Sequence, residues 1–144
     1  MGPRSLAEHR LVGLDTMVFV YALEDHPELG DPCRRLLAAI QEGRTRAVAS
    51  ALVLGELLVR PYRENRPDIA RRYSDLLVGY RNLELVTADR AICETAAQLR
   101  GREPSLRLPD AVHVATAISK GATALVTGDR RMRDVAGLEI LRPV

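Results

Sequence analysis

Short apolar runs rich in branched side chains alternate along the chain with longer stretches of helical periodicity. The apolar runs predict strands at residues 11–14, 47–49, 83–86, 124–126 and 138–141. Between them, the periodic stretches predict helices at about residues 16–25, 32–42, 51–61, 67–80, 89–101 and 109–120, followed by a short turn at 130–135. Strands that alternate with helices in this way are typical of an α/β fold, in which helices cover a parallel sheet.

The length and composition of the chain fit one domain. It has 144 residues, of which 47% are hydrophobic and 28% charged, and a single compact core is expected at roughly 100 to 200 residues. No low-complexity linker interrupts the pattern. We therefore expect residues 1–144 to form a single domain.

The charge of the chain is nearly balanced, with a formal net charge of +2 at pH 7. Nothing resembles a polybasic tail, and a sequence pI near 8.8 only weakly favours an anionic partner. Lys120 is the only lysine among 21 basic residues. Arginine suits phosphate recognition, but a GC-rich genome also supplies arginine codons, and both explanations stay open.

The chain offers few ligands for a structural zinc ion. Cys33 and Cys93 form no CxxC pair, and His9, His26 and His113 share no ligand spacing with them. No apolar run approaches the roughly 20 residues that cross a bilayer, and no apolar segment follows the charged first ten residues. We therefore expect a soluble cytoplasmic protein with no membrane partner.

Two aspartates follow directly on predicted strands. Asp15 comes after the run LVGL, and Asp129 comes after ALVTG. Open α/β sheets bind ligands at the carboxyl ends of their strands, so both aspartates are candidates for a functional site. The alternative for each is a helix N-cap, because Asp is among the best capping residues and stabilises a helix by about 1 kcal/mol.

Two further acids occupy predicted helices. Glu56 interrupts the apolar segment ALVLGELLV, where a charge has to be solvated or paired. Its alternative role is an i,i+4 ion pair with Arg60 on an exposed face. Asp110 opens the predicted helix PDAVHVATAI, where the helix dipole alone would favour a carboxylate.

As a set, these four acids indicate a metal site if they converge at the carboxyl edge of the sheet. Two unit charges 4 Å apart repel by roughly 4 kcal/mol at an effective dielectric constant of 20, so clustered carboxylates need cations to stay ionised. The donors are oxygens, with no His or Cys at ligand spacing. The expected ion is therefore Mg²⁺ or Mn²⁺ rather than Zn²⁺.

The order and spacing of four segments also resemble a known family. The segments are LDTMVFVYAL, the acid within ASALVLGELL, LPDAVHVATAI and ALVTGDRRM. From about residue 11 to residue 141 the chain is similar to the PIN-domain ribonucleases, and in size and layout to the VapC-type toxins of toxin-antitoxin pairs. One departure is Met132, where many relatives carry an aromatic residue; this changes packing and leaves the chemistry alone.

The resemblance implies a fold and a set of site residues. The fold is a three-layer PIN-like α/β fold with a parallel five-stranded sheet in the order 3-2-1-4-5, which sets the first and fourth strands side by side. The acids of the implied metal pocket are Asp15, Glu56, Asp110 and Asp129. The three aspartates are the predicted metal ligands, and Glu56 is expected to hold or deprotonate water. The hydroxyls of Thr16 and Thr127 are expected to orient metal, water or phosphate.

Basic residues flank these acids in the sequence. Two arginines lie one and two turns beyond Glu56, and two more directly follow Asp129. The candidate contacts to substrate phosphates are therefore Arg60, Arg63, Arg130 and Arg131. Ordinary solvated surface is the alternative for each of them.

Two other titratable residues are assigned structural roles. His113 lies one turn after Asp110 and is interpreted as a satisfied or surface histidine rather than a catalytic one. Asp89 ends the segment VTAD, which echoes the later VTGD. The resemblance places its strand at the edge of the sheet, so Asp89 is expected to cap a helix.

Three other classes of site lack a residue that they need. A receiver domain needs a lysine after a late strand, but Lys120 precedes the fourth strand. A phosphatase of the haloacid dehalogenase type needs a second Asp two residues after the first, where this chain has Met17. Nucleotide-binding folds need a Gly-rich loop after the first strand, and LDTMVF has none.

The favoured hypothesis is a Mg²⁺-dependent endoribonuclease that hydrolyses RNA and acts as the toxin of a type II toxin-antitoxin pair, with Mn²⁺ able to substitute. The expected partners are RNA, a cognate antitoxin that places a basic side chain in the acidic pocket, and a second copy of the chain that packs at residues 52–59. Two alternatives stay open: a non-catalytic PIN-fold module that binds RNA or protein, and a stand-alone housekeeping PIN nuclease.

Overall fold

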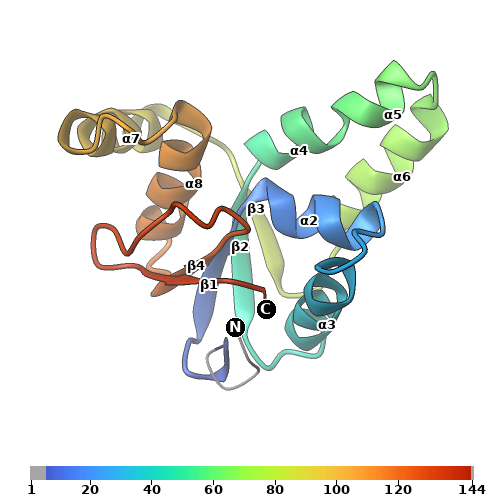
Figure 1. Cartoon of the computed structure of the whole chain (residues 1–144), viewed down its shortest axis with the longest axis horizontal. Coiled ribbons are helices and arrows are strands. Elements are labelled where there is room, and N and C mark those ends of the chain that lie inside the picture. The colour runs from blue at the N-terminus through green and yellow to red at the C-terminus, as the bar shows by residue number, and fades with distance from the viewer. Residues whose placement is uncertain (1–5, 144) are drawn as a thin grey trace.

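The computed structural model describes residues 6–143 and contains one five-stranded sheet between two layers of helices (Figure 1). The strands are β1 (Leu11–Leu14), β2 (Arg46–Ser50), β3 (Leu83–Val86), β4 (Ala124–Val126) and β5 (Glu139–Leu141). The helices are α2 (Thr16–Leu23), α3 (Gly30–Gln41), α4 (Leu52–Leu57), α5 (Val59–Arg63), α6 (Pro67–Val78), α7 (Arg90–Arg102) and α8 (Leu108–Ser119). Every neighbouring pair of strands is parallel, in the order β3-β2-β1-β4-β5. The predicted fold class and strand order are confirmed.

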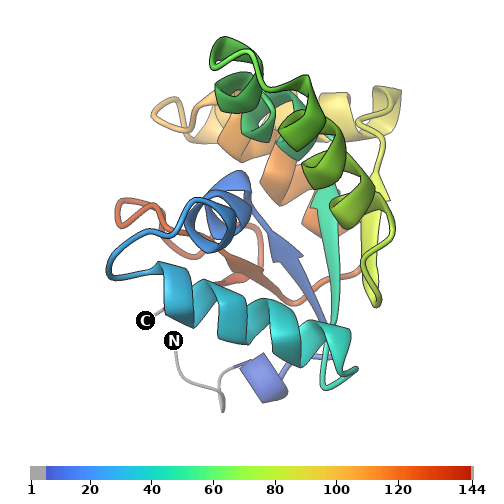
Figure 2. The ribbon, with the colours of Figure 1, turned by 90° about the vertical axis from the view of Figure 1, so that its right-hand side faces the viewer.

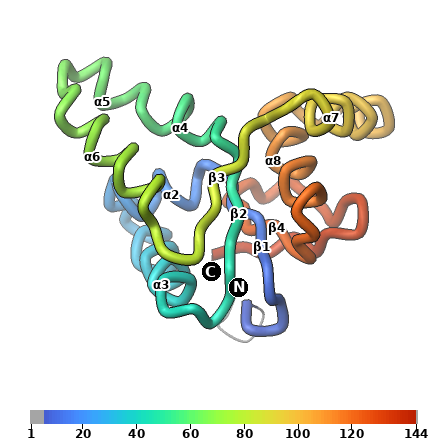
Figure 3. The backbone as a smooth tube through the Cα atoms, turned by 180° about the vertical axis from the view of Figure 1, so that it is seen from behind, coloured from blue at the N-terminus to red at the C-terminus, as the bar shows by residue number. Residues whose placement is uncertain are grey.

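The two faces of the sheet carry separate cores because successive strand residues point to opposite sides. Val12 and Leu14 of β1 pack with the residues of α2 and α3. Val48 of β2 and Leu125 of β4 pack with those of α7 and α8 on the other face. Figures 1 and 3 show that α4, α5 and α6 extend away from the sheet on the side of α2, and Figure 2 shows α3 crossing that same face.

Gly13, in the middle of β1, allows α8 to lie directly against the sheet. A Cβ atom at this position would lie 2.7 Å from the Cβ atom of Ala117, well inside the roughly 3.5 Å at which carbon atoms attract best. Because β1 is hydrogen-bonded to β2 and β4 on its two sides, it has no freedom to move away. The glycine therefore sets how closely α8 approaches the carboxyl end of β1.

The predicted helix at residues 51–61 is wrong in one respect, since the segment forms two short helices, α4 and α5, on either side of Leu58. Pro61 has no N–H to donate to the carbonyl of Leu57 one turn earlier, and its ring disturbs that turn. Glu56 and Arg60 therefore do not lie on one continuous helix. The other predicted helices and strands agree with the structure to within two residues at each end.

The helices in the described part of the chain are short. The longest of those in residues 6–143, α7, has 13 residues, and none within this range is both long and apolar enough to cross a membrane.

Candidate active site

Asp15 lies in the turn between β1 and α2, at the carboxyl edge of the sheet. Its carboxylate accepts hydrogen bonds from the backbone N–H of Met17 at 3.1 Å and from the hydroxyl of Thr127. The residue is only 5% exposed. Burial raises the pKa of this carboxyl, although the hydrogen bond from Thr127 acts in the opposite direction. Asp15 is thus a helix N-cap and a buried acid at once, so the two interpretations of its sequence position describe the same side chain.

Asp129 follows β4, the strand next to β1, and is tied to the same hydroxyl group. The Oγ1 atom of Thr127, which donates to Asp15, accepts a hydrogen bond from the backbone N–H of Asp129 at 3.0 Å. The Asp129 carboxylate accepts in turn from the backbone N–H of Arg131 at 2.9 Å and from its guanidinium at 3.2 Å. These bonds, the backbone one first, lower the pKa of Asp129. One threonine therefore links two of the predicted metal ligands.

Glu56 reaches the same edge from α4 and is held there by two side chains. Thr16 donates a hydrogen bond of 2.5 Å to its Oε1 atom. The Nε2 atom of His113 lies 3.3 Å from that oxygen and 3.3 Å from the hydroxyl of Thr16. The hydrogen bond from His113 is the main cause of a lowered Glu56 pKa, which partial burial opposes. Glu56 is therefore an ionised acceptor at neutral pH.

His113 is neither a surface histidine nor a fully satisfied one, contrary to the sequence-based interpretation. It is 4% exposed, and its Nδ1 atom has no hydrogen-bond partner among residues 6–143. A proton placed on Nε2 has Glu56 as its acceptor at 3.3 Å, so we assign a proton to that nitrogen. His113 follows Asp110 by three residues, which places the two side chains on one face of α8. This spacing is the feature of the sequence that could have indicated a role for His113 in the site.

Asp110 lies in the first turn of α8 and is paired with an arginine that the sequence analysis did not single out. The Nε atom of Arg107 donates to its carboxylate at 3.2 Å. A cavity of about 360 Å³ is lined by Asp110 and Asp129, together with Arg107 and Arg131. The i,i+3 spacing of Arg107 and Asp110 across Pro109 could have indicated this pair.

The arginine predicted as a partner of Glu56 is engaged elsewhere. Arg60 pairs with Glu24 at 3.2 Å and with Glu64 at 3.4 Å, so the proposed i,i+4 pair with Glu56 is wrong. The break at Leu58 explains this, because it separates the two residues into different helices.

The other predicted phosphate contacts lie in different environments. Arg131 lines the cavity and pairs with Asp129, whereas Arg63 and Arg130 are exposed. A role of these arginines in holding phosphate stays a prediction.

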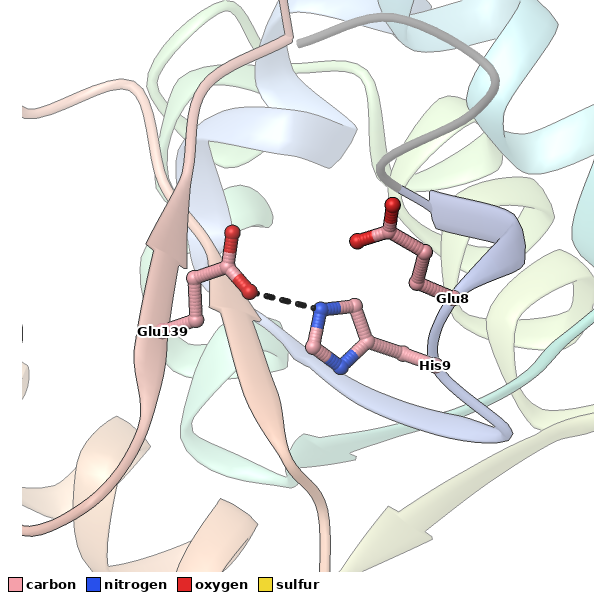
Figure 4. A group of neighbouring side chains, drawn as sticks. All are labelled: Glu8, His9 and Glu139. Carbon is pink, nitrogen blue, oxygen red and sulfur yellow. Dashed lines mark hydrogen bonds and ion pairs between the residues drawn. The ribbon is translucent and has the colours of Figure 1, made fainter.

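The four predicted acids lie along one edge of the sheet and are linked indirectly: Thr127 contacts both Asp15 and the backbone of Asp129, Thr16 next to Asp15 contacts Glu56, and Asp110 and Asp129 line one cavity. They do not form a closed ligand shell, since no three of their carboxylates bring ligand atoms within 4.8 Å of one another. Within residues 6–143, one group brings three ligand atoms of the Asp, Glu, His and Cys type within 4.8 Å of one another, and it lies at the opposite edge (Figure 4). Its members are Glu8, His9 and Glu139. The donors of the acidic pocket are carboxylate and hydroxyl oxygens, which fit Mg²⁺ or Mn²⁺.

Comparison with protein families assigns the chain to one of them. Residues 12–138, from the second residue of β1 to the residue before β5, match the model of the PIN domain. The chain belongs to the PIN domain family. The resemblance stated on the sequence segments is thereby confirmed.

A curated relative of this PIN domain is Ribonuclease VapC7 from Mycobacterium tuberculosis (strain ATCC 25618 / H37Rv). The two are 36% identical over 138 residues, which cover 88% of this chain and 87% of that protein. The similarity therefore extends over most of both chains.

Solved structures share the fold of this PIN domain at low sequence identity. The structure of VapBC2 from Rickettsia felis bound to a DNA fragment from their promoter aligns with a TM-score of 0.72 and 20% identity, over 92% of this chain and 98% of that one. FitAcB from Neisseria gonorrhoeae aligns with a TM-score of 0.66 and 18% identity, over 92% and 97%. VapC20 from Mycobacterium tuberculosis, described as a Sarcin-Ricin loop cleaving toxin, aligns with a TM-score of 0.62 and 18% identity, over 80% and 86%.

Two of the pocket acids should respond oppositely to neutralisation. In metal-free buffer at pH 7, we expect Asp15→Asn to raise the melting temperature of this PIN domain and Asp129→Asn to lower it. Folding raises the pKa of Asp15, so its ionisation lowers stability as pH rises from the ordinary value of 3.8 through the raised pKa, and the loss persists at pH 7. Folding lowers the pKa of Asp129, so its contribution is present above 3.8 and disappears as pH falls through the lowered pKa.

Thermal unfolding in EDTA, followed by circular dichroism, measures both effects. In each variant the Asn side-chain oxygen can still accept from the backbone N–H that the Asp accepts from, that of Met17 or that of Arg131, so this contact is kept while the charge is removed. Shifts of about 2 to 4 °C correspond to about 1 kcal/mol in a domain of this size. If both variants moved in the same direction, the two acids would not differ in environment as described.

Proposed function

We propose that this PIN domain is a Mg²⁺-dependent endoribonuclease that acts as the toxin of a type II toxin-antitoxin pair in the cytoplasm. One observation supports the proposal: four acids from four separate segments lie along the carboxyl edge of the sheet, linked through Thr16, Thr127 and a shared cavity. The acids are Asp15, Glu56, Asp110 and Asp129. The name of the relative that is 36% identical, Ribonuclease VapC7, supports RNA as the substrate.

The three aspartates are the residues that would hold the ion. When bound, Mg²⁺ supplies a water of lowered pKa and positive charge for the leaving oxygen of the phosphodiester. Asp15 is fixed by the end of β1 and by Thr127, which gives it the most rigid position. Asp110 and Asp129 both line the cavity. Mn²⁺ has the same preference for oxygen ligands and is expected to substitute.

Glu56 is better suited to orient a water molecule than to remove its proton. General bases work best when their pKa lies near the working pH, and the hydrogen bond from His113 lowers the Glu56 pKa. The carboxylate is therefore a fixed acceptor at neutral pH. Thr16 donates to the same oxygen at 2.5 Å and lies beside His113, so the direction of the acceptor is set before RNA arrives.

Arginines on the wall of the cavity are suited to bind the RNA backbone. Arg107 and Arg131 line it beside the two outer aspartates, and a guanidinium binds phosphate in a planar, bidentate way. Arg60, Arg63 and Arg130 would extend this contact along the strand. RNA binding should accordingly weaken with salt, because phosphate contacts release counterions.

The proposed protein partners are an antitoxin and a second copy of the chain. A basic side chain of the antitoxin would enter the acidic pocket, where a guanidinium can bind carboxylates. For the dimer, the segment 52–59 is only partly available, since Val53 and Leu57 are buried in the core. Val59 and Tyr62, which are 41% and 58% exposed, extend an apolar surface on α5 that a partner could cover.

Expression in a bacterial host tests the toxin assignment. We expect the chain alone to arrest growth and to leave cleaved RNA, and we expect co-expression of the small protein encoded next to it to restore growth. Growth unaffected by the chain alone, while the purified protein still cuts RNA, would favour a stand-alone housekeeping nuclease. Growth arrest by the Asp15→Asn variant would favour a non-catalytic binding module.

His113 should be replaceable by Gln but not by Asn. The amide nitrogen of Gln is four bonds from Cα, as is Nε2 of His, so it can still donate to Glu56; the amide nitrogen of Asn is three bonds away, like Nδ1. We expect His113→Asn to lower the cleavage rate about tenfold, the scale seen when a residue that orients a metal-site group is lost. His113→Gln should retain most of the rate. Equal losses in both variants, at equal melting temperatures, would contradict a role through the Nε2 hydrogen bond.

A further inference from the structure

The structure brings together a second group of metal-ligating side chains, far from the acidic pocket. Glu8 and His9 lie just before β1, separated from it by Arg10, and Glu139 is the first residue of β5. These positions lie at the amino ends of the strands, whereas Asp15 and Asp129 follow the carboxyl ends. Figure 4 shows the carboxylates of Glu8 and Glu139 and the imidazole of His9 directed toward one another. The ligand atoms of all three lie within 4.8 Å of one another.

His9 is oriented toward the two carboxylates by a separate contact. Its side chain is 9% exposed, and its Nδ1 atom lies 2.7 Å from the hydroxyl of Thr123. This contact directs Nε2 to the Oε2 atom of Glu139 at 3.0 Å. Histidines that bind metals are held in the same way, with one ring nitrogen fixed by a neighbouring polar group and the other free to bind.

The charges and distances of this group fit a divalent ion. Two carboxylates lie together here, and one histidine can at most balance one of them. Ligands at about 2.0 to 2.1 Å from a tetrahedral ion are about 3.3 Å from one another, so the observed separations need only small side-chain movements. Glu8 and Glu139 are exposed, which leaves them free to make those movements and leaves room for water to complete the shell.

We propose that Glu8, His9 and Glu139 form a second metal site that binds Zn²⁺ or a similar transition-metal ion. An imidazole nitrogen with carboxylate oxygens favours zinc and its neighbours, whereas Mg²⁺ prefers oxygen ligands alone. The bound ion would join the segment before β1 to the edge strand β5, residues that are 130 positions apart. This separation explains why ligand spacing in the sequence gave no sign of it. The site is independent of the proposed nuclease activity.

Zinc binding is measured by calorimetry in a background that removes other ligands. Asp15→Asn and Asp129→Asn disable the acidic pocket, and Cys93→Ser removes the exposed thiol. In this background we expect one Zn²⁺ ion per chain, a higher melting temperature with Zn²⁺, and no displacement by millimolar Mg²⁺. Co²⁺ should give a visible spectrum typical of nitrogen and oxygen ligands without sulfur.

Single replacements locate the site. Glu8→Gln and Glu139→Gln change exposed residues and should weaken Zn²⁺ binding without unfolding the protein. Thr123→Val should weaken it about tenfold, the scale for a group that orients a ligand. The matched control is Glu84→Gln, which changes an exposed acid of the other edge strand that is paired with Lys120 at 3.1 Å. It should leave the affinity unchanged.

Two results would overturn the proposal. One is the absence of saturable binding in the background protein, which would leave His9 and Glu139 as an ion pair only. The other is an affinity that Glu139→Gln and Glu84→Gln change equally, which would place the ion elsewhere. RNA cleavage by Glu8→Gln and Glu139→Gln in the otherwise natural chain should stay at its full rate. The outcome for zinc is therefore read separately from the outcome for the nuclease.

Discussion

Asp15→Asn is expected to lower the rate of RNA cleavage by about a hundredfold to a thousandfold while the protein stays folded. Among the predicted ligands, this buried carboxylate has the least freedom to adopt another position, because hydrogen bonds fix it both to the start of α2 and to Thr127. Asn retains a side-chain oxygen that can accept from the N–H of Met17 and so preserves the cap. The variant therefore removes a charge from the pocket and leaves the local backbone in place.

The chain provides a matched control for this variant. Asp89 also follows a strand and caps a helix, with its side chain accepting from the N–H of Ile92 at 2.9 Å, but its strand β3 is at the edge of the sheet, away from the pocket. Asp89→Asn should leave cleavage unchanged. Cleavage assays on a structured RNA compare the activities of Asp15→Asn and Asp89→Asn, and circular dichroism shows whether each variant is folded. Full activity of Asp15→Asn would remove Asp15 from the catalytic site.

Removal of divalent ions with EDTA is expected to abolish cleavage, and Mg²⁺ or Mn²⁺ is expected to restore it. The donors at the pocket are hard oxygens, and no side chain there offers a nucleophile of its own. We expect a rate at least a thousandfold lower in EDTA, measured by the appearance of new RNA ends. Unchanged cleavage in EDTA would refute metal-dependent hydrolysis.

Loss of activity in EDTA should not come from unfolding. Each of the four acids has a protein donor that does not depend on an ion: Thr127 for Asp15, Thr16 for Glu56, Arg107 for Asp110 and Arg131 for Asp129. The circular dichroism spectrum should therefore be the same with and without metal. Zn²⁺ is omitted from this assay because the proposed site at His9 would bind it.

The sheet could be predicted from the sequence because its strands are short, mostly apolar runs, and those of β1, β2 and β4 are buried at nearly every position. Their order came from the resemblance to a family, since periodicity carries no information on which strands are neighbours. The break at Leu58 was missed because the apolar pattern continues across it; the effect of Pro61 on the preceding turn decides it instead. Tertiary contacts then assigned Glu56 to His113 rather than to Arg60.

The candidate acids were also visible in the sequence, as were Thr16, Thr127 and Arg131, but which of these contacts which acid was not. Residues far apart in the chain supply these contacts, as with Thr127 for Asp15 and Thr16 for Glu56. Arg107 and Arg131 are close in sequence to the acids they pair with, yet they are two among 20 arginines and nothing in composition distinguishes them. Many pairs of residues in the chain have such a spacing, and only the fold shows which of them place both side chains at the same cavity.

The width of the acidic pocket depends on a residue that has no side chain. Because Gly13 brings α8 against β1, any larger residue would push that helix outward and carry Asp110 and His113 away from Asp15 and Glu56. Mg²⁺ tolerates little variation in ligand distance, whereas larger ions such as Ca²⁺ accept longer distances and more ligands. We therefore expect the packing of α8 on β1, and not the ligands alone, to limit the radius of the ion that the proposed metal site accepts.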